Sequence, residues 1–226
     1  MKSIALLSGG LDSCVALAIA QRLGLNPSAS VTILYGQRHD REIRSAEAIA
    51  AHYGLRHILI DLPIGNYIKH ASALLNPQEA LPKDRGMEEM SSAIPRSYVP
   101  GRNTMMLAIA QSIAEAFDAD CIIVGFNHLD YSGYPDCRPE FVDVWNKLAR
   151  VATKRGVEGN PIQVWTPIID MSKVDIITKG YELKAPLHLT WSCYQGREKA
   201  CGKCDSCIIR LDAFKKLKLD DPIKYR

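Results

Sequence analysis

Residues 4–20 read Ile-Ala-Leu-Leu-Ser-Gly-Gly-Leu-Asp-Ser-Cys-Val-Ala-Leu-Ala-Ile-Ala. The apolar run at 4–7 is typical of a short buried strand, and the apolar residues from Cys14 onward are typical of a helix. Two glycines stand between them, and Gly24 follows the last turn in the position of a helix C-cap. This stretch therefore predicts a strand, a tight glycine turn and a helix.

The same alternation of strand and helix continues along the chain. It favours an α/β fold, a parallel sheet with helices on both faces, in which ligands bind beyond the carboxyl ends of the strands. Apolar runs and helical periodicity predict further strands at 31–35, 57–62 and 121–125, and helices at 41–53, 103–117, 138–155, 172–180 and about 206–217.

A long polar stretch at residues 63–100 interrupts this rhythm. Pro77, Pro82, Pro95 and Pro100 divide it, and it shows no clear periodicity. Loops of this length inside a domain are usually functional or mobile. We expect residues 63–97 to form a cover that excludes water from a reaction site.

Length and composition narrow the possible classes of protein. The chain has 226 residues, of which 47% are apolar and 23% charged, as in one folded domain with at most a small appendage. The formal net charge of +3 is too small to require a nucleic-acid or membrane partner. No stretch approaches the roughly 20 apolar residues of a membrane helix, and the first apolar run is too short for a signal peptide. We expect a cytoplasmic protein that binds neither membranes nor nucleic acid.

Four of the seven cysteines lie close together, at Cys193, Cys201, Cys204 and Cys207. In a reducing compartment such clustering indicates a metal site rather than disulfides. Two-residue gaps let a tight loop place successive sulfurs around one tetrahedral ion, so zinc is expected, with an iron–sulfur cluster as the alternative. Four thiolates leave no open coordination position, so the metal would be structural.

The turn Ser8-Gly-Gly-Leu-Asp-Ser13 carries the first chemical signal. Its glycines permit a sharp bend and a close approach of ligand to backbone, and the exposed amides and helix dipole attract an anion. The Gly-Lys-Ser/Thr of a Walker A loop and the Gly-x-Gly-x-x-Gly of a dinucleotide fingerprint are both missing. Phosphate is the expected ligand, and the alternative is an ordinary turn in which Asp12 or Ser13 caps the helix.

This hexapeptide resembles the Ser-Gly-Gly-x-Asp-Ser signature of the PP-loop ATP pyrophosphatases. The resemblance implies an adenine nucleotide alpha hydrolase-like, Rossmann-like fold and cleavage of ATP between its α- and β-phosphates, with Mg²⁺ neutralising the pyrophosphate. We place the PP-loop nucleotide-binding domain at 1–185 and a four-cysteine zinc-binding segment at 186–226. The residues implied in ATP binding are Leu7, Ser8, Gly9, Gly10, Leu11, Asp12, Ser13, Cys14, Val15, Ala16 and Leu17.

Three other segments, at 35–39, 99–103 and 127–138, are rich in polar and aromatic residues and are predicted at the same sheet edge. Their guanidinium groups suit phosphates or a carboxylate, their tyrosines can stack on a flat heterocycle, and their carboxylates can accept ring N–H groups. Each residue alone is equally well explained as part of a turn, but their convergence beside the nucleotide favours a pocket. We expect substrate binding by Arg38, Asn103, Asp130, Tyr131, Tyr134 and Asp136, and catalytic roles for Asp12, Ser13 and Arg102.

Six motifs, in this order, resemble the family of 7-cyano-7-deazaguanine synthases of queuosine biosynthesis. They span almost the whole chain, and the last three are much more specific than the glycine turn. They are Ser8 to Ser13, Tyr35-Gly-Gln-Arg-His39, Pro100-Gly-Arg-Asn103, Asp130-Tyr-Ser-Gly-Tyr-Pro-Asp-Cys-Arg138, Thr190-Trp-Ser-Cys-Tyr194 and Cys201-Gly-Lys-Cys-Asp-Ser-Cys207.

The resemblance implies an ATP-dependent carbon–nitrogen ligase of purine metabolism that acts as a homodimer. Its substrates would be 7-carboxy-7-deazaguanine and ammonia, and an adenylated acid and an adenylated amide would precede the nitrile product. Two other functions remain open from the residues. One is a PP-loop enzyme that modifies a tRNA base by thiolation or lysidine formation, and the other is a zinc-ribbon protein that only senses ATP.

Overall fold

The computed structural model describes residues 1–91, 94–129 and 134–226. Five strands are present, β1 (Lys2–Leu6), β2 (Asn26–Leu34), β3 (Arg56–Asp61), β4 (Cys121–Ile123) and β5 (Gln163–Trp165). They form one parallel sheet in the order β3-β2-β1-β4-β5. The predicted parallel α/β sheet is confirmed. The sequence pattern did not predict β5, because Gln163 interrupts its short apolar run.

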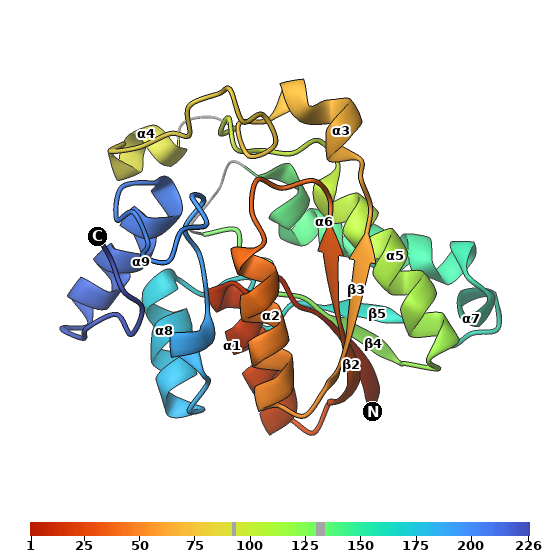
Figure 1. Cartoon of the computed structure of the whole chain (residues 1–226). Coiled ribbons are helices and arrows are strands. Elements are labelled where there is room, and N and C mark those ends of the chain that lie inside the picture. The colour runs from red at the N-terminus through yellow and green to blue at the C-terminus, as the bar shows by residue number, and fades with distance from the viewer. Residues whose placement is uncertain (92–93, 130–133) are drawn as a thin grey trace.

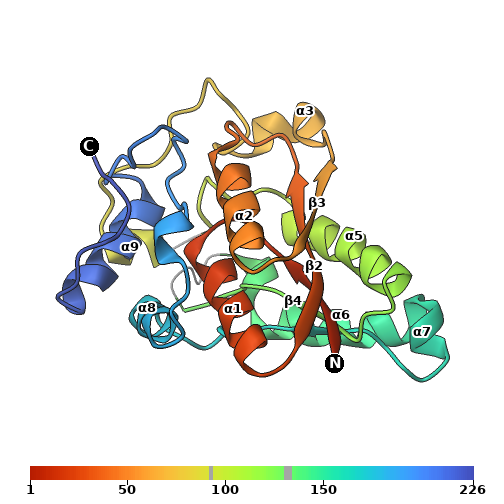
Figure 2. The same ribbon diagram turned by 60° about the horizontal axis from the view of Figure 1, so that its bottom comes forward.

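Helices cover both faces of this sheet (Figure 1, Figure 2). They are α1 (Leu11–Arg22), α2 (Arg41–His52), α3 (Gly65–Ile68), α4 (Met87–Ser91), α5 (Arg102–Ala116), α6 (Pro139–Ala152), α7 (Lys154–Val157), α8 (Lys173–Glu182) and α9 (Asp205–Lys216). Single turns of 3-10 helix lie at Lys69–Ala71, Pro135–Cys137 and Leu187–Leu189. The core of one face joins α1, α2, α8 and α9, and the core of the other joins α5 and α6.

The centre of the sheet provides the natural ligand site. Strand order reverses between β1 and β4, and in parallel sheets ligands bind beyond the strand ends at such a point. The glycine turn follows β1, and Gly125 lies just beyond β4. A Cβ atom at Gly125 would lie 2.6 Å from the backbone nitrogen of Ser13, so the two segments are in direct backbone contact.

Residues 63–91 and 94–100, called here the cover segment, pass over the carboxyl ends of the strands (Figure 1). The segment contains α3 and α4, which the sequence analysis treated as loop. Leu75 and Val99 pack with Tyr35 in a small apolar cluster, and the Ser97 hydroxyl is hydrogen bonded to the Tyr134 hydroxyl at 2.7 Å. The cover segment therefore lies at the carboxyl ends of the strands, and its role in excluding water stays a prediction.

The C-terminal segment is held by a buried ion pair. Arg210 Nε lies 2.7 Å from Asp221 Oδ2, and the two side chains are 2% and 3% exposed. Arg210 Nη1 also donates to Thr190 Oγ1 at 2.8 Å. The pair thus connects α9 to the chain end and to the residues before Cys193. Throughout the described part of the chain, each helix falls short of the length and apolar character needed to cross a bilayer.

The contact between Gly125 and Ser13 gives a stability prediction. Gly125→Ala is expected to lower the free energy of unfolding by about 1–3 kcal/mol, because the added methyl group meets backbone rather than a flexible side chain. Urea unfolding measures this. Gly86→Ala is the matched control, since nothing lies within 4 Å of a Cβ atom there. Equal stability of the two variants would show that the backbone contact is unimportant.

Candidate active site

A cavity of about 280 Å³ lies at the carboxyl ends of the strands. Its walls come from the glycine turn, the ends of β2 and β4, the starts of α2, α5 and α8, and the chain on either side of Cys193. Ten residues predicted to bind or react with substrates line it, namely Leu7, Ser8, Gly10, Leu11, Asp12, Ser13, Arg38, Arg102, Asn103 and Tyr134.

Backbone contacts hold the glycine turn in place. Gly9 has a φ of +80°, in the left-handed region that glycine adopts readily, and a Cβ atom there would lie 2.1 Å from the Glu42 carbonyl oxygen. On its other side, the Trp191 amide donates a hydrogen bond of 2.8 Å to the Gly9 carbonyl. The turn is therefore packed between α2 and the segment that leads to the cysteines.

The amino end of α1 faces the cavity without a side-chain cap. Gly10 is the N-cap residue, and no side-chain capping hydrogen bond is formed there. The Ser13 hydroxyl donates to the Gly10 carbonyl at 3.1 Å and lies 3.0 Å from the Ser8 hydroxyl. The alternative in which Asp12 or Ser13 merely caps the helix is therefore wrong. First-turn amides left uncapped attract anions, especially phosphate.

Asp12 pairs with a lysine that the sequence analysis did not identify. Lys173 Nζ lies 2.6 Å from Asp12 Oδ1, and the two side chains are 14% and 32% exposed. Both line the cavity. Lys173 is the first residue of α8, whose predicted cap is confirmed, because Ser172 and Asp175 form a capping box. The cap fixes the start of α8 beside the glycine turn.

The cavity contains further ionisable groups. Burial raises the pKa of Glu42 to about 7, although the charge of Arg102 opposes the shift. Burial also raises the pKa of the Cys137 thiol to about 11, so the group stays protonated near neutral pH. Arg102 keeps its charge, because a guanidinium is not deprotonated under these conditions. The site therefore offers a fixed cation and a carboxyl group that can exchange a proton near pH 7.

Two residues predicted to bind substrate also hold the polypeptide around the cavity. The Arg38 guanidinium donates to the carbonyl oxygens of Asn76 and Glu79 in the cover segment, the latter at 2.5 Å. The Arg38 Nε atom is buried and has no partner. Asn103 donates through Nδ2 to the Asp136 carbonyl at 2.9 Å and to Cys137 Sγ at 3.2 Å. Both side chains are thus fixed by contacts with neighbouring segments.

Some predicted site residues lie elsewhere. Gly9 does not line the cavity, because it packs against the backbone of α2. The side chains of Cys14, Val15, Ala16 and Leu17 on α1 are buried in the hydrophobic core. These four residues do not line the cavity.

Asp136 lies behind the cavity wall, where its Oδ2 accepts a hydrogen bond of 3.1 Å from the Asn103 amide and its Oδ1 is buried without a partner. Asp130 and Tyr131 are outside the described residues.

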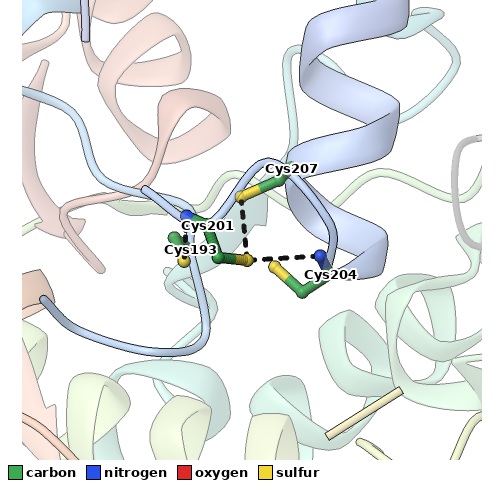
Figure 3. A group of neighbouring side chains, drawn as sticks. All are labelled: Cys193, Cys201, Cys204 and Cys207. Carbon is green, nitrogen blue, oxygen red and sulfur yellow. Dashed lines mark hydrogen bonds between the residues drawn. The ribbon is translucent and has the colours of Figure 1, made fainter. Parts of the chain in front are cut away.

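The four clustered cysteines converge between the preceding loop and the start of α9 (Figure 3). Their sulfur atoms all lie within 4.8 Å of one another. Backbone amides already donate to these sulfurs, from Cys201 to Cys193 Sγ at 3.3 Å and from Cys204 to Cys201 Sγ at 3.3 Å. Hydrogen bonds from Cys204 and Cys207 lower the pKa of the Cys193 thiol and raise the pKa of both donor thiols. The cluster is thus arranged as thiolate ligands for a metal.

Sequence reasoning missed several residues that line the cavity, among them Lys173, Glu42 and Arg210. Lys173 follows β5, and recognition of that strand would have placed it at the ligand edge with the glycine turn. Glu42 lies three residues after a quoted motif, in the first turn of α2. Arg210 lies on α9, and no local pattern indicates that this helix reaches the cavity.

Comparison with known proteins identifies close relatives. A sequence model of the family described as "Queuosine biosynthesis protein QueC" matches residues 2–218. The 7-cyano-7-deazaguanine synthase of Thermosynechococcus vestitus is 46% identical over 224 residues, which are 99% of this chain and 95% of that protein. The 7-cyano-7-deazaguanine synthase of a Nostoc species is 44% identical over 226 residues, 100% of this chain and 97% of that protein.

Among solved structures, a predicted subunit of a tRNA methyltransferase from Methanocaldococcus jannaschii matches with a TM-score of 0.49 and 19% identity, over 80% of this chain and 75% of that one.

The sequence matches extend over nearly the full length of the chain, from the glycine turn to the cysteine cluster. The resemblance stated from the six motifs is confirmed. The chain belongs to the queuosine biosynthesis protein QueC family.

Proposed function

We propose that this protein makes 7-cyano-7-deazaguanine from 7-carboxy-7-deazaguanine and ammonia, with ATP as the activating substrate. Curated relatives that match the whole chain carry the name of this synthase. The observation that carries the proposal is the uncapped amino end of α1, which faces a cavity also lined by Arg38, Arg102 and Tyr134. One site can thus hold phosphates beside a flat, anionic ring compound.

In the first half of the reaction, the substrate carboxylate attacks the α-phosphorus of ATP and pyrophosphate leaves. The amides of the glycine turn would hold the departing phosphates. Lys173 adds a positive charge at the same end of the cavity, and Asp12 lies beside it. Bound Mg²⁺ would neutralise phosphate charge, with Asp12 as its candidate carboxylate ligand. Ammonia then attacks the adenylated carbonyl, and AMP leaves to give the amide.

In the second half, the amide oxygen is activated by another ATP. Loss of that oxygen with AMP, and of the remaining protons from nitrogen, gives the nitrile. Both halves need the same protein groups, because each transfers an adenylyl group from ATP to an oxygen atom bonded to the same substrate carbon. The roles are positioning and charge stabilisation, so no nucleophilic side chain is required.

We propose that the substrate ring lies between the glycine turn and the cover segment. Arg38 and Asn103 reach this part of the cavity, and the Tyr134 ring forms part of its wall. The unpaired Nε of Arg38 leaves one donor for the substrate. Asp130 and Tyr131, which lie outside the described residues, stay proposed ring contacts. Asp136 would act indirectly, because its carboxylate holds the Asn103 backbone amide.

We propose zinc as the metal of the four-cysteine cluster. Bound zinc would cross-link the loop before α9 and do no chemistry, because four thiolates fill a tetrahedral site. Sulfurs about 2.3 Å from one ion lie about 3.8 Å apart, which is compatible with the observed spacing. In an iron–sulfur cluster the thiolates bind different irons and must stand further apart.

We further propose a cytoplasmic homodimer that acts without nucleic acid. Val144, Leu148 and Val151 form an apolar stripe on α6 and are 62%, 47% and 74% exposed. Light scattering should give twice the 25.1 kDa chain mass for the native protein, and the single-chain mass of 25.1 kDa for Leu148→Glu. A monomeric native chain would contradict the proposal.

A product assay tests the proposed reaction directly. The purified protein should release pyrophosphate from ATP only when 7-carboxy-7-deazaguanine and ammonium are both present, and mass spectrometry should find the nitrile. Pyrophosphate release that depends on tRNA would contradict the proposal in favour of base modification. ATP binding without turnover under all these conditions would favour an ATP sensor.

The Asp12–Lys173 pair gives a mutational prediction. Asp12→Asn and Lys173→Met should each lower kcat by about 10²-fold or more while the fold survives, because partly exposed charged groups are lost from the phosphate end of the cavity. Lys179→Met is the control on the same helix, since it removes only the exposed Lys179–Glu182 pair. Steady-state kinetics and circular dichroism measure the effects. Wild-type rates in either site variant would exclude its role.

Metal content tests the cysteine assignment. Cys204→Ser should lose most of its zinc and much of its soluble yield, because structural zinc contributes on the order of 10 kcal/mol to ordering its ligands. Cys14→Ala changes a buried cysteine outside the cluster and should retain about one zinc per chain. Elemental analysis by mass spectrometry provides the measurement. A stable Cys204→Ser protein with full metal content would contradict the assignment, and iron in the native protein would replace zinc.

A further inference from the structure

The cover segment and the four-cysteine loop are paired through their backbones. Lys83 and Cys204 form an antiparallel β-bridge, and the Asp84 amide donates to the Lys203 carbonyl at 2.8 Å. In Figure 1 the part of the cover segment that contains α4 lies beside the C-terminal segment. One of the predicted metal ligands therefore belongs to the bridge itself.

An ion pair strengthens this junction. Arg85 Nε donates to Asp205 Oδ1 at 3.1 Å, and Arg85 Nη2 contacts the other carboxylate oxygen. The Asp205 side chain is 0% exposed and the Arg85 side chain 19%. Such a two-pronged pair fixes orientation as well as distance. Because Asp205 directly follows Cys204 and begins α9, the pair connects the cover segment to the most constrained part of the cysteine loop.

The other part of the cover segment forms the cavity wall. Leu74 lines the cavity, and Arg38 holds the backbone carbonyls of Asn76 and Glu79. Ser97 is hydrogen bonded to Tyr134, which also lines the cavity. The same segment thus contacts the proposed substrate pocket on one side and the metal-binding loop on the other.

We propose that Arg85 is a positioning residue that latches the cover segment to the metal-binding loop, so that order in the cavity wall depends on an occupied four-cysteine site. Arg85 does not line the cavity, so it acts through the residues of the cover segment. A metal bound by Cys204 immobilises Asp205 and the Lys203 carbonyl, which are the acceptors for Arg85 and Asp84. The inference rests on the proposed function only for the identity of the substrate.

Hydrogen–deuterium exchange on the full, metal-loaded chain tests the latch. In Arg85→Gln, peptides within 72–86 should exchange at least fivefold faster, including the Asp84 amide, whereas peptides of β1 and α1 stay at wild-type rates. Metal content should remain at the wild-type level. Wild-type protein stripped by a chelator should show the same faster exchange in 72–86.

Two further variants complete the test. Arg44→Gln is the matched control, because it breaks an exposed ion pair with Asp40 on α2 and should leave exchange of the cover segment unchanged. Arg85→Lys keeps the charge without the fork and should give an intermediate rate. It also replaces Arg85→Gln as the test variant if that protein is insoluble.

Kinetics supply the readout that a purely structural role would not change. Arg85→Gln should raise KM for 7-carboxy-7-deazaguanine at least fivefold and leave KM for ATP within twofold, because the cover segment borders the substrate part of the cavity. Loss of metal from the variant without faster exchange in 72–86 would overturn the latch, as would unchanged exchange in both the variant and the stripped protein. A chain that shows the exchange changes but does not convert the carboxylate would contradict the proposed function and leave the latch intact.

Discussion

The structure depends on two glycines whose backbones pack so closely against other backbone segments that no side chain would fit between them. The Gly9 Cα faces the backbone of α2 so closely that an added Cβ atom would lie 2.1 Å from a carbonyl oxygen, and Gly125 meets the backbone of Ser13 in a similar way. These two contacts hold the first turn of α1 at the point where strand order reverses. The position of the uncapped amides, and with it the proposed phosphate site, follows from this packing of glycine against backbone.

The cavity is lined by both basic and acidic side chains. Lys173, Arg102 and Arg38 bring positive charge to its lining, and Asp12 and Glu42 bring carboxyl groups. The C-terminal segment takes part in the same arrangement, because the Trp191 amide binds the glycine turn. The cysteine cluster is therefore structurally connected to the cavity on two sides, through the glycine turn and through the cover segment.

Much of this arrangement can be predicted from the sequence, for physical reasons that differ by residue. The glycine turn, the capped start of α8 at Ser172 and the cysteine spacing are local signals, so each predicted its own structure. Lys173 was missed because β5, which precedes it, lacks the continuous apolar run that revealed β4. The side chains of Cys14 to Leu17 were assigned to ATP binding from a motif, although α1 is enclosed by its neighbours and all four side chains are buried in the core.

The latch between Arg85 and Asp205 joins residues 120 positions apart, and no sequence period reports such a contact. The boundary at residue 185 between a nucleotide domain and a zinc segment stays a prediction. The most direct measurement of the account is a crystal structure with an ATP analogue that cannot be cleaved between its α- and β-phosphates. The account predicts phosphate oxygens on the amides of residues 10–13, with Lys173 beside them. A triphosphate bound elsewhere, with the glycine turn free of phosphate, would contradict it.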